Sequence, residues 1–274
     1  MYVSVAVMDT GIFRHMDFDT RIAGFADFVG RKKYLYDDNG HGTHVAGIIA
    51  GSGKGSNGKY RGIAPDTFLV SVKVLDKSGN GKIENVVEAA GWIIENKSAM
   101  NIRIVNISFG TRAKMENGPA IETGEDDYAL IMAVEKMWDS GIVVVAAAGN
   151  NGPGNTSVTA PGISKKIITV GAFDDKNFFS GRGPTRECIV KPEVVVTGSN
   201  IIACNNHQGR YSSKSGTSMA APVVSGAVAR LIKNNPDITP KEVKIWMKSC
   251  CKKINVPSEK QGWGVLDIRK FVTG

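Results

Sequence analysis

Short apolar runs alternate with amphipathic segments along most of this 274-residue chain. Apolar runs bounded by turn residues indicate buried strands, whereas apolar positions that recur every three or four residues indicate helices. The strands predicted in this way are residues 3–7, 68–75, 102–107, 142–148 and 167–170. The stretch between residues 21 and 38 is polar and without periodicity, and we expect it to be irregular.

The predicted helices follow or precede these strands. One begins near His41 and buries Val45, Ile48 and Ile49, and another runs through the apolar segment 223–232. Two more have the apolar faces Ile83, Val86, Val87, Ala90, Ile93 and Ile94, and Ala129, Met132, Ala133 and Met137 within residues 126–138. A capping box of Thr239 and Glu242, with Pro240 between them, predicts a further helix start.

Strand-helix-strand units of this kind imply a mostly parallel sheet with right-handed crossovers and helices on both faces. We therefore expect an α/β fold with three layers. No linker, repeat or low-complexity segment divides the chain, so one domain over residues 1–274 is predicted. The long segment 111–127 carries Glu122, Glu125, Asp126 and Asp127, and is either a functional loop or a solvated insertion.

Composition narrows the classes of partner. The chain is 42% hydrophobic and 22% charged, and its net charge of +8 is scattered rather than gathered in a patch, so neither a nucleic acid nor a membrane is an expected partner. The four cysteines have no disulfide or zinc spacing, which favours a reducing, cytoplasmic setting over secretion. We expect a monomer.

Three motifs suggest chemistry that the rest of the sequence does not support. Gly53–Tyr60 resembles a phosphate-binding loop, but it follows a helix and has tyrosine where Ser or Thr should hold magnesium. His41 and His44 are spaced like metal ligands without a third ligand beside them. Asp9-Thr10-Gly11 is also the aspartic protease signature, but that mechanism needs a second carboxylate and the chain has no second copy.

A serine at a glycine-to-helix junction is the stronger signal. Ser218 lies between Gly216-Thr217 and an apolar helical run, where unpaired helix amides favour negative charge. A hydroxyl needs a base to become a nucleophile. Asp9 and His41 also stand where regular elements end or begin, so His41 is the candidate base and Asp9 the residue that orients it.

Three blocks in this order resemble the subtilase family of subtilisin-like serine proteases, whose Asp-His-Ser order is already well described. They are Val7-Met8-Asp9-Thr10-Gly11, His41-Gly42-Thr43-His44-Val45-Ala46-Gly47 and Gly216-Thr217-Ser218-Met219-Ala220-Ala221-Pro222. The resemblance implies a serine endopeptidase that forms an acyl-enzyme on Ser218. It also implies that Asn150, in Ala147-Ala148-Gly149-Asn150, completes an oxyanion hole with the Ser218 amide. The alternative is a catalytically silent binding module with the same fold.

The resemblance further implies a peptide or protein substrate bound as an extended strand between two edges. These edges are Gly79-Asn80-Gly81 and Ser108-Phe109-Gly110. Leu75, Ile83, Val86 and Phe109 would line an apolar pocket for the fourth residue before the cut, although Leu75 and Val86 fit core packing equally well. Asn151 and Thr159 would lie near the base of the pocket for the residue just before the cut, and Thr159 in place of glycine would make that pocket shallow.

One departure from the family concerns metal. Many relatives have a calcium site built partly by an N-terminal extension, which we expect to be absent along with a propeptide, since eight residues precede Asp9. The loop after the His41 helix is short and carries Lys54, Lys59 and Arg61, so calcium is not expected at this usual site, and a weaker site elsewhere stays open. No cofactor is expected to be needed for catalysis.

Overall fold

A nine-stranded sheet forms the centre of the computed structural model, which describes residues 2–111 and 124–274. Neighbouring strands are parallel except β10 and β11. Their order across the sheet is β10 (Cys251–Lys252), β11 (Val265–Leu266), β7 (Val194–Val196), β6 (Ile168–Ala172), β5 (Val143–Ala147), β4 (Ile102–Ile107), β1 (Ser4–Asp9), β3 (Phe68–Lys73) and β2 (Ile22–Asp27). The expected mostly parallel α/β sheet is confirmed.

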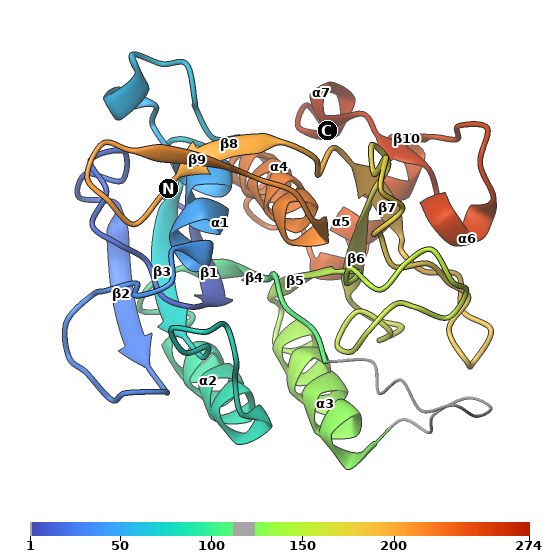
Figure 1. Cartoon of the computed structure of the whole chain (residues 1–274), viewed down its shortest axis with the longest axis horizontal. Coiled ribbons are helices and arrows are strands. Elements are labelled where there is room, and N and C mark those ends of the chain that lie inside the picture. Colours follow the sequence, from blue (N-terminus) through green and yellow to red (C-terminus); the bar gives the residue numbers. More distant parts are fainter. Residues whose placement is uncertain (1, 112–123) are drawn as a thin grey trace.

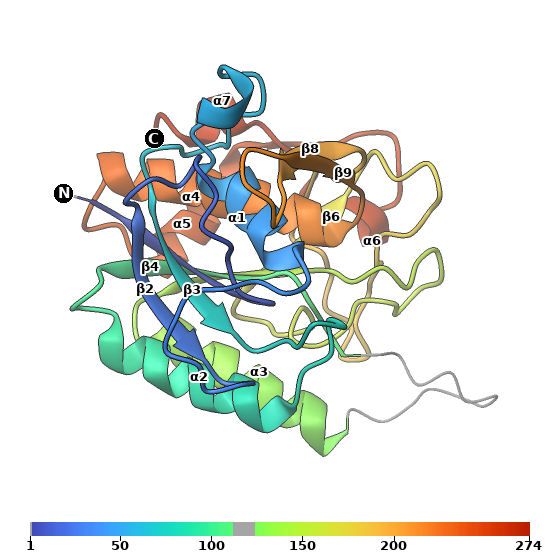
Figure 2. The same ribbon diagram turned by 60° about the vertical axis from the view of Figure 1, so that its left-hand side comes forward.

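Helices cover both faces of this sheet, as Figure 2 shows. On one face lie α2 (Ile83–Asn96) and α3 (Glu125–Asp139), and on the other α1 (His41–Ala50), α4 (Thr217–Asn234) and α5 (Pro240–Ser249). Alternate residues of the strands enter two separate buried clusters; in β1, Val5 and Val7 belong to one and Ala6 and Met8 to the other. Strands buried on both sides explain the continuous apolar runs of the sequence.

The remaining elements are short. They are the 3₁₀ turn η1 (Lys54–Ser56), the hairpin β8 (Ile201–Cys204) and β9 (Tyr211–Lys214), and the helices α6 (Ser258–Gln261) and α7 (Ile268–Phe271). The capping box predicted for α5 is present, with Thr239 accepting from the Glu242 amide and the Glu242 carboxylate accepting from the Thr239 amide. Within the described ranges, no helix combines the length and the apolarity that crossing a bilayer requires.

The central helix α4 explains the apolar segment at 223–232. Most of its side chains are buried, because it packs against β4, β5 and β6 on one side and against α1 on another. A helix that is apolar all round belongs inside the protein. Ser218 is the second residue of this helix, so the predicted position of the serine at a helix start is confirmed.

Three expectations for the elements are wrong. Residues 21–38 are not wholly irregular, because β2 forms the half-buried edge of the sheet there, where burial on one side leaves a weak apolar pattern. Val87 and Met132 were expected on the apolar faces of their helices, but their side chains are 41% and 49% exposed. In α3, Ala133 and Met137 are buried as expected, but Leu130 and Val134 complete the buried face in place of Ala129 and Met132.

The acidic segment 111–127 divides into two parts. Glu125, Asp126 and Asp127 form the first turn of α3, where acidic side chains interact favourably with the helix dipole. This structural role differs from the expected loop. Glu122 lies outside the described residues.

Candidate active site

The carboxyl ends of three neighbouring strands bring the candidate residues to one edge of the sheet. Asp9 is the last residue of β1, Ser108 follows β4, and Asn150 lies just beyond β5. The helices α1 and α4 pack side by side and begin at this same edge with His41 and with Thr217-Ser218 (Figure 1). The carboxyl edge of a parallel sheet is where such folds place their ligands.

Asp9 and His41 form the expected pair. The Nδ1 atom of His41 lies 2.8 Å and 3.0 Å from the two carboxylate oxygens of Asp9, which is fully buried. The backbone N–H of Thr10 donates to Asp9 Oδ1 at 2.7 Å and fixes that carboxylate. Since Nδ1 donates to Asp9, the tautomer leaves Nε2 of His41 as the basic nitrogen.

A glycine makes this close packing of α1 on β1 feasible. A Cβ atom at Gly42 would lie 2.2 Å from the carbonyl oxygen of Gly11 and 3.0 Å from Cβ of Asp9. Any side chain at residue 42 would therefore push the start of α1, and His41 with it, away from Asp9.

Burial and charge act in opposite directions on His41. Burial alone would lower its pKa, but the charge and hydrogen bond of Asp9 outweigh burial and hold the pKa of His41 above its ordinary value. The side chain is 25% exposed, so a proton can still exchange with solvent. A raised pKa makes His41 a stronger base toward a hydroxyl.

Ser218 points to a different partner from the one expected. Its hydroxyl donates to the backbone carbonyl of Ser108 at 2.8 Å, and among the described residues it makes no hydrogen bond to His41. Catalytic hydrogen bonds are often loose without substrate. The structure therefore brings Ser218 to the same sheet edge as Asp9 and His41, while a direct bond between Ser218 and His41 stays a prediction.

A buried hydrogen-bond chain beneath Ser218 was not predicted from the sequence. Ser225 on α4 donates to Asn106 Oδ1 at 2.8 Å, and Asn106 donates to Ser108 Oγ at 2.9 Å. The Ser108 hydroxyl then donates to the carbonyl of Ser218 at 3.0 Å. The signal available in the sequence was a single asparagine inside the apolar run 102–107.

Asn150 is held in an orientation that suits an oxyanion donor. Its Oδ1 accepts hydrogen bonds from the backbone N–H and the hydroxyl of Thr217, at 3.0 Å and 3.1 Å. Thr217 directly precedes Ser218, so the side-chain amide lies beside the nucleophile. With Oδ1 occupied by two donors, Nδ2 remains the group that can donate to a developing negative charge.

Most of the residues predicted to bind substrate line one cleft of about 1140 Å³. Its walls include Leu75, Gly79, Asn80, Gly81, Ile83, Val86, Phe109, Gly110 and Thr159. Ser108 lies outside this lining and accepts a hydrogen bond from the Ser218 hydroxyl, and Asn151 is exposed and also lies outside the lining. The lining also includes Glu125, Asp126 and Asp127 from the acidic segment noted in the sequence, whereas Glu135 and the ion pair of Lys165 with Glu187 were not indicated by the sequence.

Thr159 is a lining residue of the cleft that packs against two glycines. Its hydroxyl oxygen would lie 2.2 Å from a Cβ atom at Gly110 and 2.8 Å from one at Gly149, so it occupies the space between these two glycines. The residue is 8% exposed.

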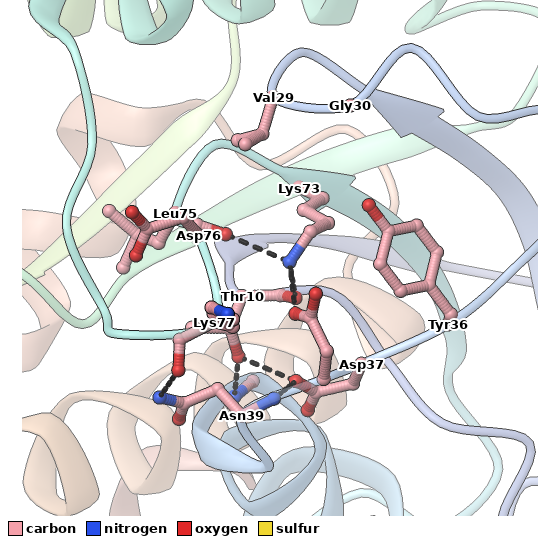
Figure 3. A network of polar contacts seen from close by, with 12 residues as sticks. Thr10, Val29, Gly30, Tyr36, Asp37, Asn39, Lys73, Leu75, Asp76 and Lys77 are labelled. Carbon is pink, nitrogen blue, oxygen red and sulfur yellow. Dashed lines mark hydrogen bonds and ion pairs between the residues drawn. The ribbon is translucent and has the colours of Figure 1, made fainter.

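Beneath Asp9, a buried lysine ties together the segments that carry the pair. Lys73 is 1% exposed and lies beside Asp9 in the β1–β3 register. Its ammonium donates to the carbonyl oxygens of Thr10 and Leu75 at 2.6 Å and 2.9 Å, and to Asp38 at 2.7 Å. Figure 3 shows the ammonium pointing toward Thr10 and the turn that contains Asp37 and Asn39.

The two histidines of the His-x-x-His motif contact different parts of the protein. His44 points away from the catalytic edge, and its Nε2 lies 3.1 Å and 3.0 Å from the carbonyl oxygens of Ile201 and Ser212 in the β8–β9 hairpin. Burial lowers the pKa of His44 to about 4. His44 is therefore a neutral, structural histidine.

Another group with metal-ligand chemistry, His15, Asp17 and Cys204, is also closed by hydrogen bonds. The Asp17 carboxylate accepts from the backbone amides of Gly53 and Gly55 at 3.0 Å and 2.8 Å, and from the Tyr211 hydroxyl at 2.9 Å. Calcium needs oxygen ligands, but the loop after α1 presents N–H groups to this carboxylate. The donor set at this loop does not fit a calcium ion.

Comparisons with known proteins give an independent indication of the family. A sequence model of the subtilase family matches residues 2–264. The chain is 42% identical to the serine protease AprX of Bacillus subtilis, over 90% of this chain and 60% of AprX. It is 34% identical to subtilisin DY of Bacillus licheniformis, over 88% of this chain and 81% of that relative.

Solved structures give the same result. A cold-adapted subtilisin-like serine proteinase superposes with a TM-score of 0.76 at 29% identity, covering 96% of this chain and 86% of that one. Sphericase superposes with a TM-score of 0.80 at 26% identity, covering 96% and 90%. The chain thus spans most of these structures but only 60% of the length of AprX.

Proposed function

The chain belongs to the subtilase family of subtilisin-like serine proteases, and from this premise we propose that it is an endopeptidase acting through Ser218. The observation that carries the proposal is the buried Asp9 carboxylate bonded to His41 Nδ1 at 2.8 Å, at the sheet edge where Ser218 begins α4. This arrangement leaves Nε2 of His41 free to accept the serine proton.

In the proposed mechanism, Ser218 Oγ attacks the peptide carbonyl carbon while its proton passes to His41 Nε2. Asp9 stabilises the resulting imidazolium. Asn150 Nδ2 and the Ser218 amide bind the oxyanion of the tetrahedral intermediate. His41 then protonates the leaving amine, the C–N bond breaks, and water activated by His41 hydrolyses the acyl-enzyme.

The cleft supports a substrate in extended form. Gly79–Gly81 and Phe109-Gly110 both belong to its lining, and a peptide strand laid between these two segments would pair through its backbone with little demand on sequence. The Ser108 carbonyl, which now accepts the Ser218 hydroxyl, lies at the same edge. We expect a medium-sized apolar residue before the cut, because the Thr159 side chain, part of the cleft lining, occupies the space between Gly110 and Gly149.

A silent binding module is the second candidate, and the contact of the Ser218 hydroxyl with Ser108 instead of His41 is the observation that favours it. Digestion of denatured casein by the wild type and by Ser218→Ala separates the two. The protease proposal predicts peptide products from the wild type alone, with medium apolar residues before the cuts. Intact casein with both proteins would support the silent module.

A further inference from the structure

Asp37, in the turn before α1, has a carboxylate with an unusual number of partners. It is 6% exposed and accepts five hydrogen bonds. Oδ1 accepts from the Thr10 hydroxyl at 2.9 Å and from the amides of Asn39 and Gly40 at 3.0 Å and 2.8 Å. Oδ2 accepts from the amide and hydroxyl of Thr43 at 3.0 Å and 2.6 Å.

These partners come from the two elements that carry the catalytic pair. Thr10 directly follows Asp9 at the end of β1, and Thr43 lies in the first turn of α1, two residues after His41. Thr10 also contacts both elements of the catalytic pair. Its N–H donates to Asp9 Oδ1, and its hydroxyl oxygen accepts from the Gly42 amide at 2.9 Å. Figure 3 shows Thr10 and Asp37 joined within this network.

We propose that Asp37 is a positioning residue for catalysis: through Thr10 and Thr43 it holds Asp9 and His41 at hydrogen-bond distance. This inference rests on the proposed protease function of the same site. Asp37 does not touch the reacting atoms. A buried carboxylate suits the task because it accepts several N–H and O–H groups at once and so fixes two elements with one side chain.

Asp37 also contributes charge to the surroundings of His41. The charged or titratable groups around this imidazole are Asp9 on β1, Asp37 in the turn, Lys214 on β9 and His44 on α1. Burial lowers the pKa of His41, Asp9 raises it, Lys214 lowers it and Asp37 raises it. Loss of the Asp37 charge should therefore lower the pKa of His41.

The variant Asp37→Asn tests both roles. In this variant an NH₂ group replaces one carboxylate oxygen. Because NH₂ cannot accept a hydrogen bond, the bonds from Thr43, or those from Thr10, Asn39 and Gly40, would be lost. We expect kcat to fall about 10- to 100-fold, the scale of a small misplacement of catalytic groups, with KM nearly unchanged. The acid limb of the pH profile of kcat/KM should move to lower pH.

Asp27 provides a matched control. It is 7% exposed, and its carboxylate accepts from the amides of Val29, Gly30 and Lys32 and from the Tyr36 hydroxyl at 2.8–3.0 Å. All of these donors belong to the segment between β2 and Asp37. We expect both Asp27→Asn and Asp37→Asn to lower Tm. Asp27→Asn, however, should leave kcat and the acid limb of the pH profile at wild-type values.

Thr10→Val separates geometry from charge, with Thr10→Ser as the variant that restores the hydroxyl. The valine variant should lower kcat without moving the acid limb, and the serine variant should recover most of kcat. This pair also tests the proposal if Asp37→Asn fails to fold.

NMR titration of the His41 imidazole in wild type, Asp37→Asn and Asp27→Asn measures the charge effect without turnover. A lower His41 pKa in Asp37→Asn alone supports the proposal. Wild-type kcat and an unchanged His41 pKa in folded Asp37→Asn, or wild-type kcat in Thr10→Val, would overturn it. An inactive wild type would instead contradict the protease function.

Discussion

Single side chains decide whether this site can stabilise a transition state. Asn150 is the clearest case, because Thr217 occupies its carbonyl oxygen with two hydrogen bonds and so orients its amide nitrogen. A donor that is fixed before the reaction needs no reorganisation when the oxyanion forms. Its contribution should therefore appear in kcat.

Replacing Asn150 by alanine should lower kcat by about 10²–10³ with KM little changed, a magnitude taken from the equivalent experiment in subtilisin. Steady-state kinetics on a peptide substrate measure it, and circular dichroism checks the fold. Asn155→Ala, in the exposed part of the same loop, is the control and should retain wild-type kcat. An Asn150→Ala enzyme with wild-type kcat would remove Asn150 from the oxyanion hole.

Thr159 is the residue expected to limit the size of the side chain before the cut. In Thr159→Gly the space between Gly110 and Gly149 opens, so kcat/KM for substrates with Phe or Tyr before the cut should rise relative to Ala by about 10-fold or more. Matched peptides that differ only at that residue measure the ratio. If the ratio stayed at its wild-type value, Thr159 would not form the base of this pocket.

At the scale of elements, α1 connects the catalytic edge to the β8–β9 hairpin. His41 faces Asp9 at one side, and one turn later His44 contacts carbonyl groups of both hairpin strands. Burial lowers the pKa of His44 from its ordinary 6.5 to about 4. Between these values the unfolded chain binds a proton that the folded protein does not, so stability falls as the pH decreases through this range.

His44→Gln should reveal this dependence. At neutral pH the variant should have a lower Tm than the wild type, because a hydrogen bond to the hairpin is lost or weakened. The difference in Tm should shrink as the pH falls from about 6.5 toward 4, since only the wild type carries the proton-linked penalty. His207→Gln, at an exposed histidine, should show no such trend. A difference in Tm that stayed constant with pH would contradict the assignment of a neutral, buried His44.

The strands and helices with strong patterns were predictable, and the weaker ones were not. Buried strands such as β5 are apolar throughout, so their position followed directly from the sequence. The edge strand β2 and the β8–β9 hairpin are partly exposed, which weakens their apolar pattern, and β2 pairs with β3, which lies far along the chain. In α3, Ala133 and Met137 were assigned correctly, but Leu130 and Val134 were missed because several small and apolar side chains fit two faces almost equally well.

At the scale of the whole molecule, the sheet edge gathers residues that are distant in sequence. Asp9, His41, Asn150 and Ser218 were predicted from motifs and from resemblance, and the sheet topology explains why they meet. The contacts that hold these residues in place were not predictable. The hydrogen bonds of Asp37 and Lys73 and the Ser225–Asn106 bond join residues far apart in the sequence, and only the folded structure shows which of them are close. The sequence motifs also did not predict that the Ser218 hydroxyl donates to the carbonyl of Ser108.

The fold should not depend on calcium at the loop after α1, because backbone amides already satisfy Asp17 there. Thermal unfolding in excess EDTA and in excess calcium chloride should give Tm values within about 2 °C, which corresponds to less than ~1 kcal/mol for a chain of this size. Asp17→Asn should lower Tm equally in both buffers. A large fall in Tm with EDTA that Asp17→Asn abolished would contradict this account.

The central claim is that Ser218 is a nucleophile because His41, oriented by Asp9, accepts its proton. Covalent labelling tests this claim most directly. The protein would be incubated with a serine-directed fluorophosphonate, and intact mass and peptide mapping would locate the adduct. We predict one adduct per chain on Ser218, none in Ser218→Ala, and strongly slowed labelling in His41→Ala. Stoichiometric labelling of Ser218→Ala, or an unlabelled folded wild type, would contradict the account.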